Sequence, residues 1–174
     1  MFYFDGDLKK YEAEHSWDEA LLHLEDQFLN SPTCEKLNSL VGFSWYYLIE
    51  GPIDSGKYEK DESKLPLATW EKYIKIGMDN YINDHRFCFI AGYTLLLHGF
   101  FIKAYQHNYK SIGLGLLESS ANTTDTYLKE LVDTIINLEH SKKYVKSEVS
   151  ITALSNLFSQ NSLLEKYFKD MFSK

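Results

Sequence analysis

The chain has 174 residues, of which 44% are hydrophobic, 25% charged and 16% aromatic, the composition of a soluble globular protein whose core is rich in large rings. It carries 18 basic residues against 25 acidic ones, a net charge of −7, and Arg86 is its single arginine. Because basic patches supply most of the affinity for nucleic acid and for anionic lipid, this balance argues against direct binding to either.

The amino-terminal part of the chain contains one short strand candidate, residues 1–5, and the first helical pattern. From Trp17 onward, apolar side chains recur at intervals of four, three and four residues, which places them on one face of a helix. Ser16 and Glu19 have the spacing of a capping box, so we expect a helix over residues 16–30 that Ser16 caps. The region lacks an apolar run of signal-peptide length, and a cytoplasmic location is expected.

A second helix is predicted over residues 34–51, with Ser31 as its cap. Gly51 followed by Pro52 should end this helix, since glycine and proline together mark a turn. The polar segment that follows, up to Pro66, is the longest loop candidate in the chain. Loops of such length are often functional or mobile.

Further helical patterns follow to the end of the chain. Gly113 and Gly115 interrupt one of them, which indicates a close helix contact or a break. We therefore expect an all-α protein, a single helical domain over residues 1–174, whose six or seven amphipathic helices form an irregular bundle or a short solenoid-like stack. The later helices are expected over residues 67–83, 86–107 and 109–121, from residue 126 onward, and over 147–174, where residues 159–162 could divide the last one.

The segment from Phe87 to Ile102 contains sixteen residues without a charge. A membrane-spanning helix needs about 20 predominantly apolar residues, and this segment includes His98, which is costly in the middle of a bilayer. A helix that is apolar on all sides is also typical of the centre of a globular core. We therefore expect a buried core helix, no membrane insertion, and a hydrogen-bonded core role for His98.

Motifs for catalysis, cofactors or metals are incomplete. Residues 51–57 match the glycine and lysine positions of a phosphate-binding loop, but Tyr58 stands where the magnesium-binding hydroxyl of serine or threonine is required. The histidines are scattered, and Glu12 with His15 is a lone Glu-x-x-His pair where a di-iron site needs two. The two cysteines have no CxxC spacing and are expected to be reduced thiols. We therefore predict no cofactor, no metal site and no enzymatic activity.

The acidic residues are unevenly distributed along the chain. Residues 1–30 hold eight of them against Lys9 and Lys10, a net of six negative charges out of the surplus of seven. One interpretation is a solvated acidic face, and the other is a landing surface for a basic protein, because complementary charge steers encounter. The candidate partner-binding residues are Asp5, Asp7, Glu12, Glu14, Asp18, Glu19, Glu25 and Asp26, together with Asp54, Tyr58, Glu59, Asp61 and Glu62 in the predicted loop.

The chain is small, acidic, rich in tyrosine and tryptophan, and helical in pattern, in stretches such as EHSWDEALLHLEDQ and SLVGFSWYYLIEGPIDSGKYEKDES. In this it resembles the immunity proteins of bacterial toxin systems such as contact-dependent growth inhibition. The resemblance implies a protein that binds a basic, nuclease-like toxin and covers its active surface, with acidic side chains steering the encounter and aromatic ones anchoring it.

Two other function classes stay open at the level of sequence. One is a helical-repeat interaction module with a regulatory role, which would present a groove lined by exposed tyrosine or tryptophan. The other is an enzyme with an unfamiliar helical site, which would bring polar groups with perturbed pKa values together in a pocket.

Overall fold

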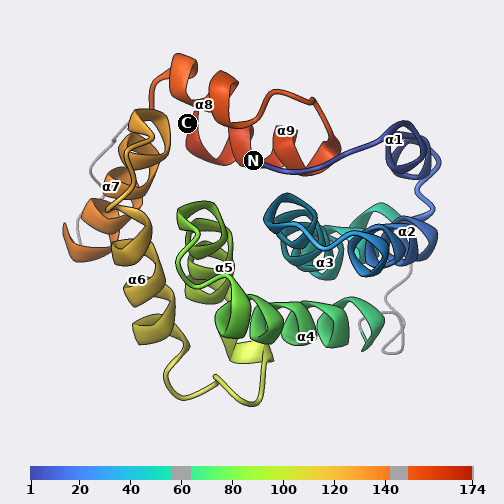
Figure 1. Ribbon diagram of the computed structural model, residues 1–174, viewed down its shortest axis with the longest axis horizontal. Helices are drawn as coiled ribbons and strands as arrows, with labels where there is room; N and C mark the ends of the chain where they lie inside the picture. Colours follow the sequence, from blue (N-terminus) through green and yellow to red (C-terminus); the bar gives the residue numbers. More distant parts are fainter. Residues whose placement is uncertain (56–63, 142–148, 174) are drawn as a thin grey trace.

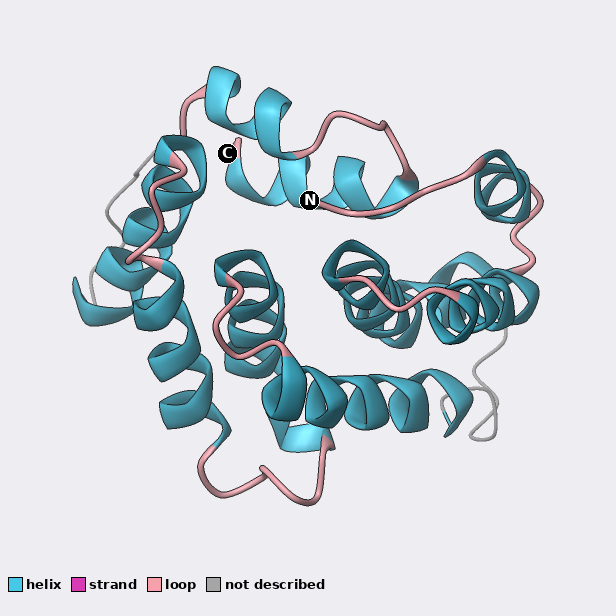
Figure 2. Cartoon of the chain, in the orientation of Figure 1, coloured by secondary structure: helices cyan, strands magenta, loops and turns pink. Residues whose placement is uncertain are grey.

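The computed structural model describes residues 1–55, 64–141 and 149–173, and every regular element among them is a helix (Figure 2). The all-α class is thereby confirmed. The expected number of six or seven helices is wrong, because the described residues hold nine α-helices and one 3-10 helix. They are α1 (Gly6–Ala13), α2 (Trp17–Asn30), α3 (Cys34–Ser55), α4 (Lys64–Asn80), α5 (His85–His98), η1 (Gly99–Phe101), α6 (Tyr109–Ser120), α7 (Thr126–Ser141), α8 (Ile151–Leu157) and α9 (Leu163–Phe172).

The two additional helices are α1 and one half of the last predicted helix. α1 begins behind Asp5, whose side chain accepts a hydrogen bond from the N–H of Leu8. The last predicted helix is divided into α8 and α9, as the sequence allowed, and Ser162 caps the second piece. Ser16, by contrast, makes no capping hydrogen bond at the start of α2, so that part of the prediction is wrong.

Residues 1–5, the one short strand candidate, form no strand. The N–H of Tyr3 donates to Oγ of Ser39 at 2.7 Å, and the same Oγ lies 2.9 Å from the carbonyl oxygen of Tyr3. A side chain of α3 therefore satisfies the backbone groups that a neighbouring strand would have paired. Phe2 and Phe4 are both buried in this arrangement.

α3 begins at Cys34, as predicted, but its cap and its end differ from the prediction. Thr33, not Ser31, provides the cap, since its Oγ1 accepts a hydrogen bond from the N–H of Lys36. The helix also continues past Gly51 instead of stopping there. A Cβ atom at Gly51 would lie 2.2 Å from the ring of Tyr47, so this glycine makes room for a buried ring within the helix.

α5 is the core helix that the apolar segment predicted. Residues 87–96 are all buried, and the described part of the chain holds no helix long and apolar enough to cross a membrane. The helix ends at His98 and does not reach residue 107, because the chain turns into η1. Nδ1 of His98 accepts a hydrogen bond from the indole N–H of the buried Trp45 at 3.1 Å, which confirms the predicted core role of this histidine.

Two glycines bring α5 and α6 into direct backbone contact. A Cβ atom at Gly113 would lie 2.8 Å from the carbonyl oxygen of Gly92, too close for the two helices to keep their positions. The close helix contact predicted from the glycines of α6 is therefore confirmed at Gly113. Gly115 has nothing within 4 Å of its Cβ position and makes no such contact.

Most helices that follow one another in the chain pack together, and α3 and α5 lie at the centre with the others around them (Figure 1). α9 returns to α3, and the ring of Phe2 packs against Phe158 and Phe168 with centroids 6.2 and 5.8 Å apart. The first and last parts of the described chain therefore share one core. α1 and α2 lie at its edge, on the right of Figure 1, and carry the acidic residues to the surface.

Candidate partner-binding surface

α2 places one face against the core and the opposite face outward. The buried face is the one that the helical spacing predicted. Because a helix turns once in about 3.6 residues, side chains one or two places away from the buried set point outward. Besides Asn30 at its end, the exposed residues of α2 are Asp18, Glu19, Leu22, Asp26 and Leu29, which we call the α2 ridge.

α1 adds two further carboxylates to the same edge of the molecule. Asp7 and Glu14 are exposed, at the first turn and at the carboxyl end of α1. Together with the three acids of the α2 ridge they make five exposed carboxylates on two neighbouring helices. Asp18 also accepts a hydrogen bond from the hydroxyl of Tyr47 at 2.9 Å, which orients the carboxylate without neutralising its charge.

Asp5 and Glu25 lie on the same two helices, but their carboxylates are engaged within the fold. Oδ2 of Asp5 lies 2.8 Å from Nε2 of His23; burial acts to raise the pKa of Asp5, but hydrogen bonds from a backbone N–H of α1 and from His23 outweigh it and lower the pKa. Oε1 of Glu25 accepts hydrogen bonds from Lys72 at 2.7 Å and from the hydroxyl of Tyr73 at 2.8 Å, and the contact with Lys72 lowers the pKa of Glu25. These two carboxylates hold α1 to α2 and α2 to α4.

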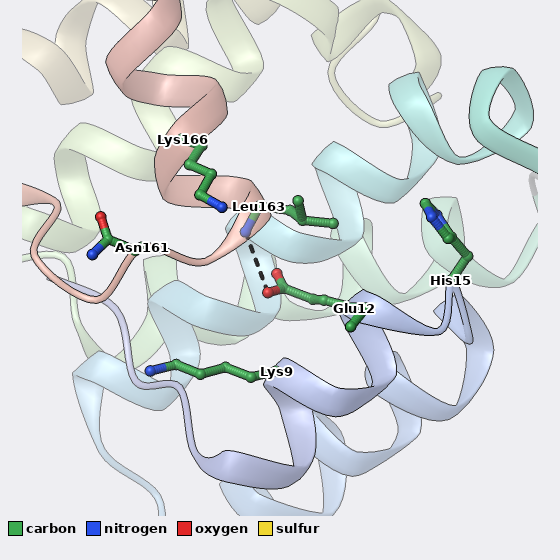
Figure 3. A pocket seen from close by; sticks show the side chains of 7 residues that line it. Lys9, Glu12, His15, Asn161, Leu163 and Lys166 are labelled. Atoms are coloured by element: carbon green, nitrogen blue, oxygen red, sulfur yellow. Dashed lines mark hydrogen bonds between the residues drawn. The ribbon is translucent and has the colours of Figure 1, made fainter.

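Glu12 is not a surface residue, so its prediction as a partner-binding residue is wrong. It is only 4% exposed, and its Oε2 accepts a hydrogen bond from the N–H of Leu163, the first residue of α9, at 3.2 Å (Figure 3). Oε1 is buried without a hydrogen-bond partner, and burial raises the pKa of Glu12. Glu12 therefore ties α1 to the amino end of α9 and cannot reach a partner.

A pocket of about 280 Å³ lies beside Glu12, between α1 and the start of α9 (Figure 3). Lys9 and Lys166 approach it from the two helices, so its border is basic. His15 and Asn161, where the chain leaves α1 and enters α9, also line it and have positive φ angles of 54° and 59°. The carboxyl group of Glu12 lines this pocket but is almost closed off from solvent, and its hydrogen bond to Leu163 stabilises the contact between α1 and α9.

A second pocket, of about 310 Å³, lies where α3, α5 and α7 begin. Cys34 lines it, and burial raises the pKa of this thiol well above its usual value. Burial likewise raises the pKa of Cys88 to about 11. Both cysteines are free thiols, as predicted, and neither is a thiolate nucleophile at neutral pH. The other lining residues are Glu35, Asn38, Asp84, His85, Arg86, Thr123 and Asp125.

Two further features of the described residues narrow the possible sites. No group of three or more histidine, cysteine or acidic side chains in them could hold a metal ion. Trp17, Trp45 and Trp70 are all buried, so none of them can line the exposed aromatic groove expected of a helical-repeat interaction module.

Comparison with protein-family models, curated proteins and solved structures finds no match to this chain. Its function must therefore be argued from the geometry of its own residues.

The predicted loop contributes less to this argument than the amino-terminal acids do. Tyr58, Glu59, Asp61 and Glu62 lie outside the described residues. Of Asp54 only the backbone position, within α3, is described.

Sequence reasoning missed two apolar members of the α2 ridge. Leu22 and Leu29 are 52% and 60% exposed, although both belong to a helix with a well-formed buried face. The signal was present in the sequence, because each leucine lies one residue after a member of the predicted buried face. Single exposed apolar residues are ordinary, but two leucines seven residues apart lie on one line along the helix and are candidates for a contact with something outside the chain.

Proposed function

We propose that this chain binds a basic protein through the outer surface of α1 and α2 and thereby neutralises it, as an immunity protein neutralises a toxin. The observation that supports the proposal is the gathering of five exposed carboxylates on these two neighbouring helices. Lys9 and Lys10 are the exposed basic residues of α1, so the surface keeps a surplus of three negative charges, five minus two.

The proposed mechanism is electrostatic capture followed by steric cover. A toxin that cleaves nucleic acid needs a basic surface to hold its substrate. An acidic protein is drawn to such a surface, and the attraction acts over about 8–10 Å at ordinary salt concentration. Once seated there, the bound chain excludes the nucleic acid from the toxin's active surface.

Charge reversal at two of the carboxylates tests the proposal. Glu14→Lys and Asp26→Lys are suitable because both residues are exposed and lie at or near the carboxyl ends of their helices, where the helix dipole favours lysine. The probe is the basic protein encoded by the adjacent reading frame. We expect the double variant to associate about tenfold more slowly at low salt, with a weaker dependence on salt concentration, as measured by stopped-flow fluorescence.

A matched control is available elsewhere in the chain. Glu118→Lys and Glu139→Lys introduce the same change of charge at exposed positions near the carboxyl ends of α6 and α7. The control should associate nearly as fast as the unaltered chain. Equal slowing in both double variants would mean that net charge alone is sensed, and absence of any association at low salt would refute the proposed function.

A further inference from the structure

The two leucines of the α2 ridge indicate which kind of structure the partner presents to this surface. Leu22 and Leu29 are seven residues apart, two turns of helix, and therefore lie about 10 Å from each other on one line along α2. Each is more than half exposed. The described part of the chain thus leaves two apolar side chains uncovered on the outer face of α2.

The residues between and beside these leucines are acidic. Glu19, Leu22, Asp26 and Leu29 are all exposed and follow one another at intervals of three, four and three, which is the spacing of side chains that meet a helix lying alongside. The buried face of α2, which packs against other helices, has the related spacing of four, three and four. The exposed series of side chains alternates acidic residues with leucines, whereas the buried series is apolar throughout.

The negative charge of the ridge is not compensated by basic side chains of the described residues. Asp18, Glu19 and Asp26 have no ion pair with any of them, and Lys72 pairs with Glu25, which lies outside the ridge. A helix that covers the two leucines must therefore carry its own apolar side chains at two-turn spacing and basic side chains on either side of them. An acidic or neutral helix would leave the carboxylates uncompensated.

We propose that the segment of the partner that docks on the α2 ridge is a cationic amphipathic helix, which lies along α2 with its apolar side chains on Leu22 and Leu29. This inference rests on the proposed function and specifies the partner's structure. Charge then sets the rate of association, and the leucine contacts set the lifetime of the complex.

The experiment separates those two roles by kinetics. Leu22→Ser and Leu29→Ser, combined, should raise the dissociation rate of the complex with the adjacent-gene protein by about tenfold or more and change the association rate by less than about twofold. Leu22→Met with Leu29→Met should restore slow dissociation. Ile151→Ser is the matched control, because Ile151 is 79% exposed on α8, away from the ridge, and should leave both rates unchanged.

The form of the docking segment is measured separately. Hydrogen exchange on the complex should show a protected segment of the partner that, as a synthetic peptide, becomes helical by circular dichroism when it binds the chain. Protection of a strand, a loop or an acidic segment would overturn the inference.

The outcomes for the inference and for the proposed function differ. Unchanged dissociation in the serine variant, with slowed association in the Glu14 and Asp26 variant, would overturn the helix inference and leave the proposed function in place. Failure of the unaltered chain to bind would overturn both. Self-association of the chain alone, abolished by the serine substitutions and seen by sedimentation velocity, would assign the ridge to a second copy and also overturn the inference.

Discussion

The contact between Trp45 and His98 fixes the protonation of the histidine. An indole N–H can only donate, so Nδ1 of His98 must accept and carries no proton. Burial of His98 lowers its pKa below the ordinary value of about 6.5. The unfolded chain therefore takes up a proton at this residue before the folded chain does. As the pH falls below about 6.5, this difference reduces the free energy of unfolding.

We predict that His98→Asn removes this pH dependence, because the asparagine carbonyl can accept from Trp45 but does not titrate. Urea denaturation followed by tryptophan fluorescence at about pH 7.5 and about pH 5.5 measures it. The unaltered chain should lose more stability between the two values than the variant does. Equal losses would mean that His98 titrates alike in the folded and unfolded chains.

The contribution of Glu12 to the free energy of unfolding depends on pH in the opposite sense to that of His98. Its pKa is raised by burial, so between its ordinary pKa and its raised one the folded chain holds the proton more tightly, and stability falls as the pH rises through that interval. We predict that Glu12→Gln keeps the hydrogen bond from Leu163, flattens this fall and is no less stable than the unaltered chain at neutral pH. Glu12→Ala should lose about 1–3 kcal/mol in the free energy of unfolding, because the N–H of Leu163 loses its acceptor.

Denaturation of both variants at several pH values checks this pair of predictions. Similar destabilisation by glutamine and by alanine would show that the charge of Glu12, and not only its acceptor oxygen, is needed. Glu165 is also buried with a raised pKa, and its charge contributes to raising the pKa of Glu12. Both variants remove this repulsion equally, so the comparison of glutamine with alanine measures the acceptor oxygen.

At the scale of elements, replacing the two glycines of α6 by alanine is expected to change the free energy of unfolding in opposite directions. In Gly113→Ala the new methyl group would meet backbone atoms of α5, so the helices must separate, and we expect a loss of roughly 1–3 kcal/mol in the free energy of unfolding. In Gly115→Ala the methyl group enters open space, and the better helix propensity of alanine should add up to about 1 kcal/mol. Chemical denaturation of the two variants measures both changes in the free energy of unfolding. Changes in the same direction would contradict the close backbone contact between α5 and α6.

Element boundaries were predicted well where they depend on local spacing and poorly where they depend on contacts. The buried faces of α2 and α5 follow from the order of apolar residues. α1 has a weak apolar pattern and is held by Asp5 and Glu12, whose partners are 18 and 151 residues away in sequence. The passage of α3 through Gly51 depends on the position of one ring, which the spacing of residues does not contain.

At the scale of the whole molecule, Phe168 joins the two ends of the chain in one core. Its ring lies 5.8 Å from that of Phe2, 5.9 Å from that of Trp45 and 5.3 Å from that of Phe158, between centroids. We predict that Phe168→Ala lowers the free energy of unfolding by roughly 3–5 kcal/mol, as for other buried aromatic side chains. Met171→Ala, on the exposed side of the same helix, should cost less than about 0.5 kcal/mol.

Thermal denaturation of the two α9 variants, with hydrogen exchange at Tyr3, measures this effect. Tyr3 follows Phe2 and donates its N–H to Ser39, so its protection should fall when Phe168 is removed. Full protection at Tyr3 in Phe168→Ala would show that the amino-terminal segment is held without the contact to α9.

The order of residues alone established the helical class, the burial of residues 87–96 and the acidic character of the amino-terminal part, whereas at Gly113 and Gly115 it left a close contact or a break as alternatives. These properties depend on composition and on the spacing of neighbouring residues, which the sequence states directly. It could not sort the acidic residues by role. Glu19 and Asp26 are exposed, whereas Glu12 and Glu25, of the same charge and the same region, are engaged with α9 and α4.

Only the tertiary structure made that division, because a carboxylate is free or engaged according to what a distant segment places beside it. The same holds for Leu22 and Leu29: the spacing puts them beside the core-facing stripe, but their exposure depends on whether another helix covers them. Local periodicity decides which residues can share a face, and long-range packing decides which faces remain open to a partner.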